Sequence, residues 1–281
     1  MINISFVLII LGIFQGITEF LPISSSGHLA LLEQTDTVKN LMGDLSDEMN
    51  LLINVSLHIA TLLAVVLYMR KEIFIIIKGF FTGLIKRDFS NQDFLSGIYI
   101  IIASIPAGVL GFCFHKHIEA IFSSVTIILI FLIINGFILI AANKIPSKDR
   151  KFKELGIFRS IMIGLCQAVA LLPGISRSGS TLAGGLLCGL EGVEAARFSF
   201  LMAIPVIAGA GLLEGLKAAK GSYPSDIFLP ILAGMLAAFI VALAAIRILF
   251  WIVKNVRLDI FGFYTIALGV SGLIIKFLII G

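Results

Sequence analysis

The sequence predicts an all-α polytopic membrane protein with about six transmembrane helices and two oppositely oriented re-entrant helical hairpins, related by an inverted internal repeat. Of its 281 residues, 59% are hydrophobic and only 14% are charged, and the mean hydropathy is +1.09, well above the range of soluble domains. The apolar runs are long enough to cross a hydrocarbon core of ~30 Å as helices, and they lack the alternation of a membrane barrel. We therefore expect one integral membrane domain over residues 1–281.

Six apolar stretches have near-spanning length, and they cover residues 50–69, 93–114, 124–143, 195–216, 226–250 and 258–280. Lysine and arginine collect in three of the connecting segments, 70–92, 144–159 and 254–257. By the positive-inside rule these segments are cytoplasmic loops. The intervening loops are poor in basic residues and face outward, at 34–49, 115–123 and 217–226.

Two further apolar segments, 1–33 and 156–192, are each broken midway by proline and glycine. Both are predicted to enter the membrane and return to their own side. Irregular backbone inside a membrane is tolerated only where protein or a water-filled cavity surrounds it, so a site is expected between the two tips. Residues 1–21 lack a basic start and a small-residue cleavage site, and we expect them to stay in the mature fold.

The two broken segments match each other at a fixed offset of 152 residues, with "GIFQGITEFLPISSSG" at 12–27 over "GLCQAVALLPGISRSG" at 164–179. Chance similarity between membrane segments rich in small residues is the alternative. The matches indicate repeat halves of about 1–143 and 156–281. Duplicated units of opposite topology place a binding site near mid-membrane, with helix N-termini facing anions. The repeat therefore predicts an anion site.

The first tip carries polar groups in an apolar setting: Gln15, Glu19, Ser24, Ser25, Ser26, Gly27 and His28. Gln15 and Glu19 are four residues apart and share a helix face. A carboxylate inside a membrane is expected to face water or a partner. The serine-rich turn can present backbone N–H groups and hydroxyls to an anion, and a histidine can exchange protons near neutral pH.

The second tip, "PGISRSGSTLAGG", adds Gly174, Ser176, Arg177, Ser178 and Thr181. Glycine allows close backbone approach, and the guanidinium of Arg177 suits phosphate oxygens. Two alternatives stay open: the hydroxyls can serve only helix packing, and Arg177 can form a purely structural ion pair with Glu19. Together the tips predict a phosphate cradle with a carboxylate and an acid–base group.

Other polar residues are given less weight. Asn54 and His58 are expected to be interhelical hydrogen-bond partners, and the roles of Glu194 and Arg197 stay open. The cysteines are assigned to packing. The net charge of +4 is small, and no nucleic-acid partner is expected.

These motifs resemble those of the bacterial undecaprenyl-pyrophosphate phosphatases of the bacitracin-resistance type. "QGITEFLPISSSGH" is similar to the (E/Q)xxxE segment with its serine-rich turn and histidine, and "LLPGISRSGST" is similar to the PGxSRSxxT motif. The likeness covers essentially the full chain. It implies an enzyme that hydrolyses the terminal phosphate of undecaprenyl pyrophosphate, recycling the lipid carrier for cell-wall synthesis. The reaction would occur at the outer face of the bacterial cytoplasmic membrane with a divalent cation, Mg²⁺ or Ca²⁺.

The resemblance also implies residue roles. Gln15 and Glu19 would form the acidic-motif pair, Ser25 and His28 would supply the nucleophile or acid–base group, and the pyrophosphate would be bound by Ser176, Arg177 and Thr181. Because Gln15 carries no charge, Glu19 is the candidate metal ligand. The nucleophile stays open between Ser25, His28 and a water activated by Glu19. A polyprenyl-phosphate transporter or flippase is the alternative function, and a homodimer is a further expectation.

Overall fold

The computed structural model describes residues 4–33, 38, 45–122, 124–146, 148–221, 223–255 and 257–280, and these residues form helices joined by turns. Six of the helices are long and apolar enough to cross a membrane: Glu48–Tyr68, Gln92–Phe114, Val125–Asn143, Gly192–Ala218, Ser225–Lys254 and Asp259–Leu278. Each overlaps one of the six predicted stretches over nearly its whole length. The predicted spans are therefore confirmed in length and composition.

Two pairs of shorter helices occupy the broken segments. The first pair is α1 (Ile4–Thr18) and α2 (Ser25–Glu33), and the second is α8 (Ile157–Val169) and α9 (Arg177–Leu187). At 1.5 Å per residue, α1 and α8 extend roughly 20 to 23 Å, less than the ~30 Å of a hydrocarbon core. Each pair is a helical hairpin whose turn lies at the proline and glycine positions that the sequence indicates.

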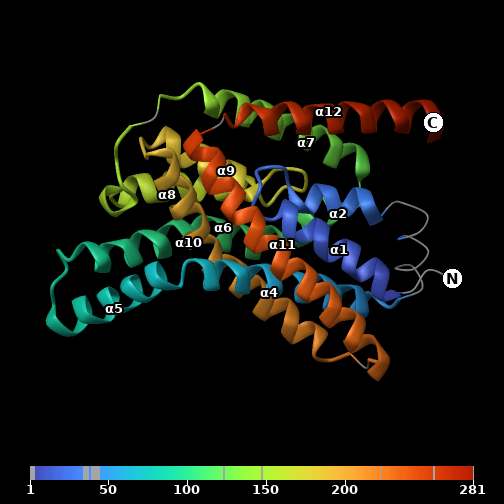
Figure 1. Cartoon of the computed structure of the whole chain (residues 1–281), viewed down its shortest axis with the longest axis horizontal. Helices are drawn as coiled ribbons and strands as arrows, with labels where there is room; N and C mark the ends of the chain where they lie inside the picture. Colours follow the sequence, from blue (N-terminus) through green and yellow to red (C-terminus); the bar gives the residue numbers. More distant parts are fainter. Residues whose placement is uncertain are drawn as a thin grey trace.

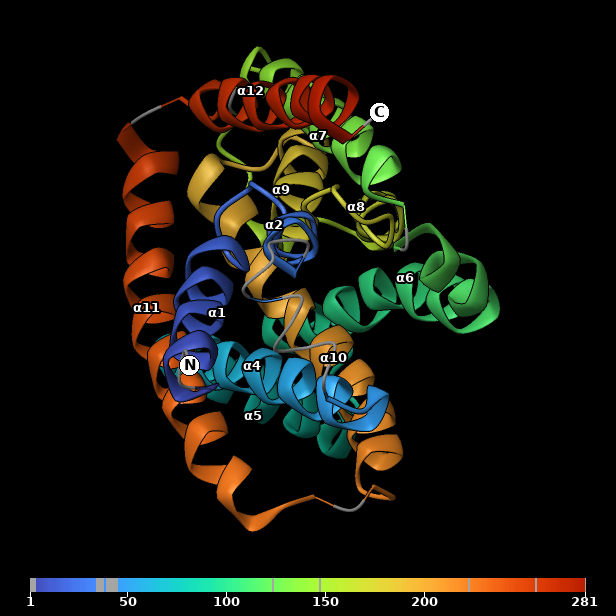
Figure 2. The same ribbon diagram turned by 90° about the vertical axis from the view of Figure 1, so that its right-hand side faces the viewer.

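The longer helices surround these hairpins (Figures 1 and 2). They are α4 (Asp47–Tyr68), α5 (Arg70–Lys86), α6 (Gln92–Phe122), α7 (Val125–Asn143), α10 (Gly192–Ala218), α11 (Phe228–Asn255) and α12 (Asp259–Ile275). Figure 1 shows α7 and α12 running side by side along the top of the molecule. Short turns of helix complete the chain at Phe152–Glu154, Ser225–Ile227 and Lys276–Ile280.

The prediction of a loop over 70–92 is wrong for most of its length. The structure has helix α5 there, separated from α4 by Met69 alone. Gly79 and Gly83 lie directly against Asp93 and Phe94 of α6, so closely that a side chain at either glycine would overlap them. Most of the basic residues lie at the two ends of an apolar run, with Lys78 in its middle, and this run forms a helix that packs against α6.

Each hairpin packs on a helix from the other half of the chain. Helix α1 lies along α11 (Figure 2), where a Cβ at Gly12 would come within 3.0 Å of the carbonyl carbon of Gly234. Helix α8 lies along α6, where a Cβ at Gly164 would come within 3.0 Å of the carbonyl carbon of Ala103. Glycine permits both close approaches. The hairpin of the first half thus packs against a helix of the second half, and the hairpin of the second half packs against a helix of the first.

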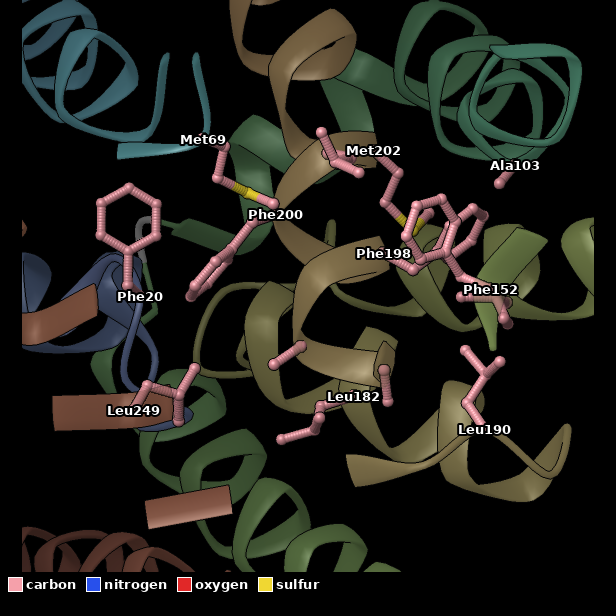
Figure 3. Close-up of a cluster of buried hydrophobic side chains, with 14 of the residues drawn as sticks. Phe20, Met69, Ala103, Phe152, Leu182, Leu190, Phe198, Phe200, Met202 and Leu249 are labelled. Atoms are coloured by element: carbon pink, nitrogen blue, oxygen red, sulfur yellow. The ribbon is translucent and has the colours of Figure 1, made fainter. Parts of the chain in front are cut away.

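A buried aromatic cluster fixes the turn of the first hairpin (Figure 3). Phe20 is fully buried, and its ring meets that of Phe200 on α10 edge-on, with centroids 5.3 Å apart. Phe200 in turn meets Phe250 of α11 at 5.5 Å. Because Phe20 directly follows Glu19, this packing holds the backbone at the carboxylate in place.

Candidate active site

The two hairpin turns are capped in the same way. The hydroxyl of Ser24 accepts a hydrogen bond from the backbone N–H of Gly27 at 3.1 Å, and the hydroxyl of Ser176 accepts one from Gly179 at 3.1 Å. Serine at a helix start satisfies backbone N–H groups that lack an intrahelical partner. The two serines that match at the 152-residue offset therefore make the same cap hydrogen bond, although their backbones differ, with φ of +71° at Ser24 and −77° at Ser176.

The two turns also contact each other. The hydroxyl of Ser178 donates to the carbonyl of Leu21 at 3.0 Å, and the N–H of Gly174 donates to the hydroxyl of Ser26 at 3.5 Å. Gly174 has a φ of +98°, and a Cβ at this position would lie 2.5 Å from the carbonyl oxygen of Ile128. Only glycine suits both the conformation and the space.

Asn135 of α7 joins the two turns from the side, a role that the sequence reasoning missed. Its Nδ2 donates to the carbonyl of Pro22 at 3.2 Å, and its Oδ1 accepts from the N–H of Ser176 at 2.9 Å. The side chain is fully buried. The signal was present, since "LIINGFILI" places one amide within a wholly apolar helix, where buried polar groups need partners.

The carboxylate of Glu19 is the centre of the site. Its Oε2 accepts hydrogen bonds from the amide of Gln15 at 3.1 Å and from the hydroxyl of Ser25 at 2.8 Å. Its Oε1 accepts from Nη2 of Arg177 at 2.8 Å. The predicted shared face of Gln15 and Glu19 is confirmed, and the structure brings both together with Ser25 and Arg177.

Arg177 retains an open donor. Its Nη1 is buried and has no hydrogen-bond partner within the described part of the chain. A buried charged donor without a partner is costly, so this atom marks a position where an anionic oxygen would bind.

A cavity of about 420 Å³ adjoins these groups. Its polar wall includes Glu19, Ser25, Ser26, Asn54, His58, Ser176 and Arg177. Its apolar wall includes Val206, Ile207 and Ala210 of α10 and Phe122 at the end of α6. The cavity thus joins a charged end to an apolar side, which suits a ligand with an anionic head and a hydrocarbon tail.

His58 lies on this cavity and not between helices as predicted. Its Nδ1 donates to the carbonyl of Asn54 in its own helix at 2.9 Å. Its Nε2 stands 3.9 Å from Oε2 of Glu19, and 39% of its side chain is exposed. The expectation of an interhelical hydrogen bond is therefore corrected, because the backbone of α4 satisfies one ring nitrogen and the other faces the cavity.

His28 is directed elsewhere. Its Nδ1 donates to the carbonyl of Ser24 at 2.8 Å, and its Nε2 hydrogen-bonds the hydroxyl of Tyr264 on α12 at 2.7 Å. The two rings stack with centroids 5.6 Å apart. Among the described residues, His28 is not part of the cavity wall. The structure does not bring it to Ser25, whose hydroxyl donates to Glu19 instead.

The remaining predicted residues support the turns. Thr181 donates to the carbonyl of Arg177 at 2.8 Å, and its hydroxyl contacts that of Ser199 on α10 at 2.6 Å. Thr181 therefore links α9 to α10. It is not among the described residues that line the cavity. Glu194 accepts from Arg197 at 2.9 Å and from the N–H of Phe152 at 3.2 Å, and so stabilises the chain before α8.

The described side chains at the site would supply only some of the ligands of a divalent cation. Within the described residues, no group of three or more histidine, cysteine, aspartate or glutamate side chains is placed to hold a metal ion. Glu19 already accepts hydrogen bonds from three side chains, of the roughly four that a carboxylate can accept. One protein carboxylate together with substrate phosphate oxygens is nevertheless a usual way to bind Mg²⁺.

The chain is similar to known proteins over nearly its whole length. A family model described as "Bacitracin resistance protein BacA" matches residues 8–271. The chain is 39% identical over 276 residues to an undecaprenyl-diphosphatase of Thermomicrobium roseum, covering 95% of this chain and 96% of the relative. It is 39% identical over 262 residues to that of Thermosipho africanus, covering 93% and 96%. It is also 36% identical over 278 residues to that of Methanosphaera stadtmanae, covering 95% and 96%.

Proposed function

The chain belongs to the bacitracin resistance protein BacA family, and on that premise we propose that it is an undecaprenyl-diphosphatase. It hydrolyses the terminal phosphate of the polyprenyl pyrophosphate carrier, giving undecaprenyl phosphate and phosphate. The observation that carries this proposal is that Ser25 and Arg177 both donate hydrogen bonds to the carboxylate of Glu19 beside the cavity. This set holds a proton acceptor, a hydroxyl and a phosphate-binding cation within direct contact.

The pyrophosphate head is bound at the charged end of the cavity. The open Nη1 of Arg177 takes a phosphate oxygen, and the N-terminal ends of α2 and α9 both lie at this end. Helix N-termini carry a partial positive charge that favours phosphate. The hydroxyls of Ser26 and Ser176 on the cavity wall are further donors.

Ser25 is the nucleophile in this proposal, with Glu19 as its base. The hydroxyl already donates to Oε2 of Glu19 at 2.8 Å, so its proton has an acceptor in place. The oxygen attacks the terminal phosphorus, the bond to the bridging oxygen breaks, and lipid monophosphate leaves. Water then hydrolyses the phosphoserine. Because both nitrogens of His28 are engaged away from the cavity, His28 is less suited to attack.

We also propose that a divalent cation, Mg²⁺ or Ca²⁺, binds with the substrate. Glu19 would be its protein carboxylate ligand, and substrate oxygens would provide others. The cation would neutralise charge on the phosphate oxygens.

The lipid tail would lie along the apolar wall formed by Val206, Ile207 and Ala210 and reach the bilayer beside α10. The wall also includes Phe122 and Glu214, which adjoin the loops predicted to face outward. This supports a multi-pass protein of the bacterial cytoplasmic membrane whose site opens to the outer face. The matched caps and exchanged helix contacts support re-entrant hairpins in an inverted repeat. The homodimer stays a prediction.

Phosphate release by the purified protein in detergent tests the proposal. Undecaprenyl pyrophosphate or a shorter prenyl pyrophosphate would be the substrate, with and without EDTA. We expect release that stops with EDTA and returns with added Mg²⁺ or Ca²⁺. A protein that releases no phosphate but moves prenyl phosphate across vesicle membranes would instead be a transporter, which opposed hairpins also permit.

A further inference from the structure

The cavity contains a histidine that the proposed mechanism has not yet used. His58 of α4 faces the carboxylate of Glu19, with Nε2 and Oε2 3.9 Å apart. Its Nδ1–H is held by the carbonyl of Asn54 at 2.9 Å. This hydrogen bond fixes the ring so that Nε2 is the nitrogen directed at the cavity.

The position of Nε2 suits a substrate contact. Glu19 is covered by Arg177 on one oxygen and by Ser25 and Gln15 on the other, and the 3.9 Å separation leaves the His58 nitrogen without a short contact to that carboxylate. The charged or titratable side chains of the described cavity wall are Glu19, Glu33, His58, Arg177 and Glu214. Of these, His58 is the imidazole, which can carry a donor hydrogen on the cavity-facing nitrogen while its other nitrogen is anchored by a backbone carbonyl.

We propose that His58 is a catalytic residue that donates a proton to the leaving lipid monophosphate. This inference rests on the proposed phosphatase function and deepens it. Ser25 attacks the terminal phosphorus and its proton passes to Glu19. The bond from that phosphorus to the bridging oxygen breaks, and the bridging oxygen takes the proton from Nε2 of protonated His58.

The second half of the reaction restores every group. Water attacks the phosphoserine phosphorus and gives one proton to the now neutral His58, and the bond between phosphorus and Ser25 oxygen breaks. Glu19 returns its proton to that oxygen. One water is consumed, and lipid monophosphate and inorganic phosphate are the products.

A substrate whose leaving group needs no proton distinguishes a proton-donor role of His58 from a structural role. Two prenyl pyrophosphates would be compared, the natural one and an analogue with sulfur in place of the oxygen between the two phosphorus atoms. The thiophosphate leaves without protonation at sulfur. Wild-type protein, His58→Gln and the matched control His117→Gln would be assayed with metal fixed; His117 is exposed on α6 and is not in the described cavity wall.

General acids contribute about a hundredfold or more, so His58→Gln should lower kcat at least about a hundredfold on the oxygen substrate and less than about fivefold on the sulfur substrate. His117→Gln should match wild type on both. Activity of His58→Gln on the sulfur substrate also shows that the variant folds.

Equal losses of His58→Gln on both substrates, or full activity on the oxygen substrate, would overturn the proton-donor role while leaving the phosphatase proposal in place. A wild-type protein that cleaves neither substrate would overturn the proposed function, and this inference with it.

Discussion

Arg177 of the second hairpin turn donates to Glu19 of the first, with Nη2 and Oε1 2.8 Å apart, although the two residues are 158 positions apart in sequence. The ion pair does not use all the donors of Arg177, because its Nη1 has no hydrogen-bond partner within the described residues. A purely structural pair would have little reason to leave a buried donor open. This relationship is the basis of the first prediction.

We expect Arg177→Ala to lower phosphate release at least about a hundredfold, as loss of one preorganised charge contact does in other active sites. Arg177→Lys should recover less than about a tenth of the activity, because an ammonium cannot contact the carboxylate and a phosphate oxygen in a fixed fork. Initial rates at saturating substrate and metal measure both. Near-wild-type turnover of Arg177→Ala would contradict the site.

Ser25→Ala should nearly abolish turnover, since the variant lacks the oxygen that forms the covalent intermediate. His28→Gln should have a smaller effect on rate and a larger one on stability, because it disturbs the buried contact with Tyr264. Rapid acid quench with labelled terminal phosphate should trap phosphoserine in the wild-type protein. Label on histidine, or substantial activity in Ser25→Ala, would point to another nucleophile.

Asn135→Leu should lower the unfolding midpoint in detergent. The change leaves the N–H of Ser176 and the carbonyl of Pro22 without their partner, at roughly 1 to 3 kcal/mol for each buried group. Ile134→Ala is the matched control, since this neighbouring side chain is 39% exposed. Equal midpoints for Asn135→Leu and the control would show that the amide does not join the hairpins.

Single cysteines test the orientation in a background whose three native cysteines are replaced. Ser90→Cys and Asp149→Cys lie on exposed positions beside basic segments, and we expect them to be protected from an impermeant thiol reagent in intact cells. Lys220→Cys, exposed at the end of α10, should react. The reverse pattern would invert the topology and place the cavity mouth on the cytoplasmic side.

The spans and the turns could be predicted because their signals are local. A long apolar run is sufficient for a membrane helix, and serine caps and Pro-Gly breaks stand within a few residues of the turns that they form. The direction in which a side chain points can depend instead on residues far away in the sequence. The orientation of His28 depends on Tyr264, 236 residues further along the chain. The motif therefore indicated His28, while the cavity wall holds His58.

Helix α5 was missed for a related reason. Its basic residues were interpreted as those of a cytoplasmic loop, but the close contact of Gly79 with Asp93 depends on how α5 and α6 pair. Asn135 also has no motif of its own, and its two partners become visible only when the turns are side by side.

The exchanged packing of the hairpins has a consequence for how the protein is made. Helix α1 emerges from the ribosome before α11 (Phe228–Asn255), which carries the glycine-lined surface on which α1 packs. At bacterial and eukaryotic translation speeds, the intervening ~200 residues take roughly 10 to 40 s to synthesise. For most of that interval Glu19 has neither Arg177 nor α11 beside it. The nascent chain would therefore have to shelter a short, carboxylate-bearing helix at the insertion machinery until its distant partner arrives.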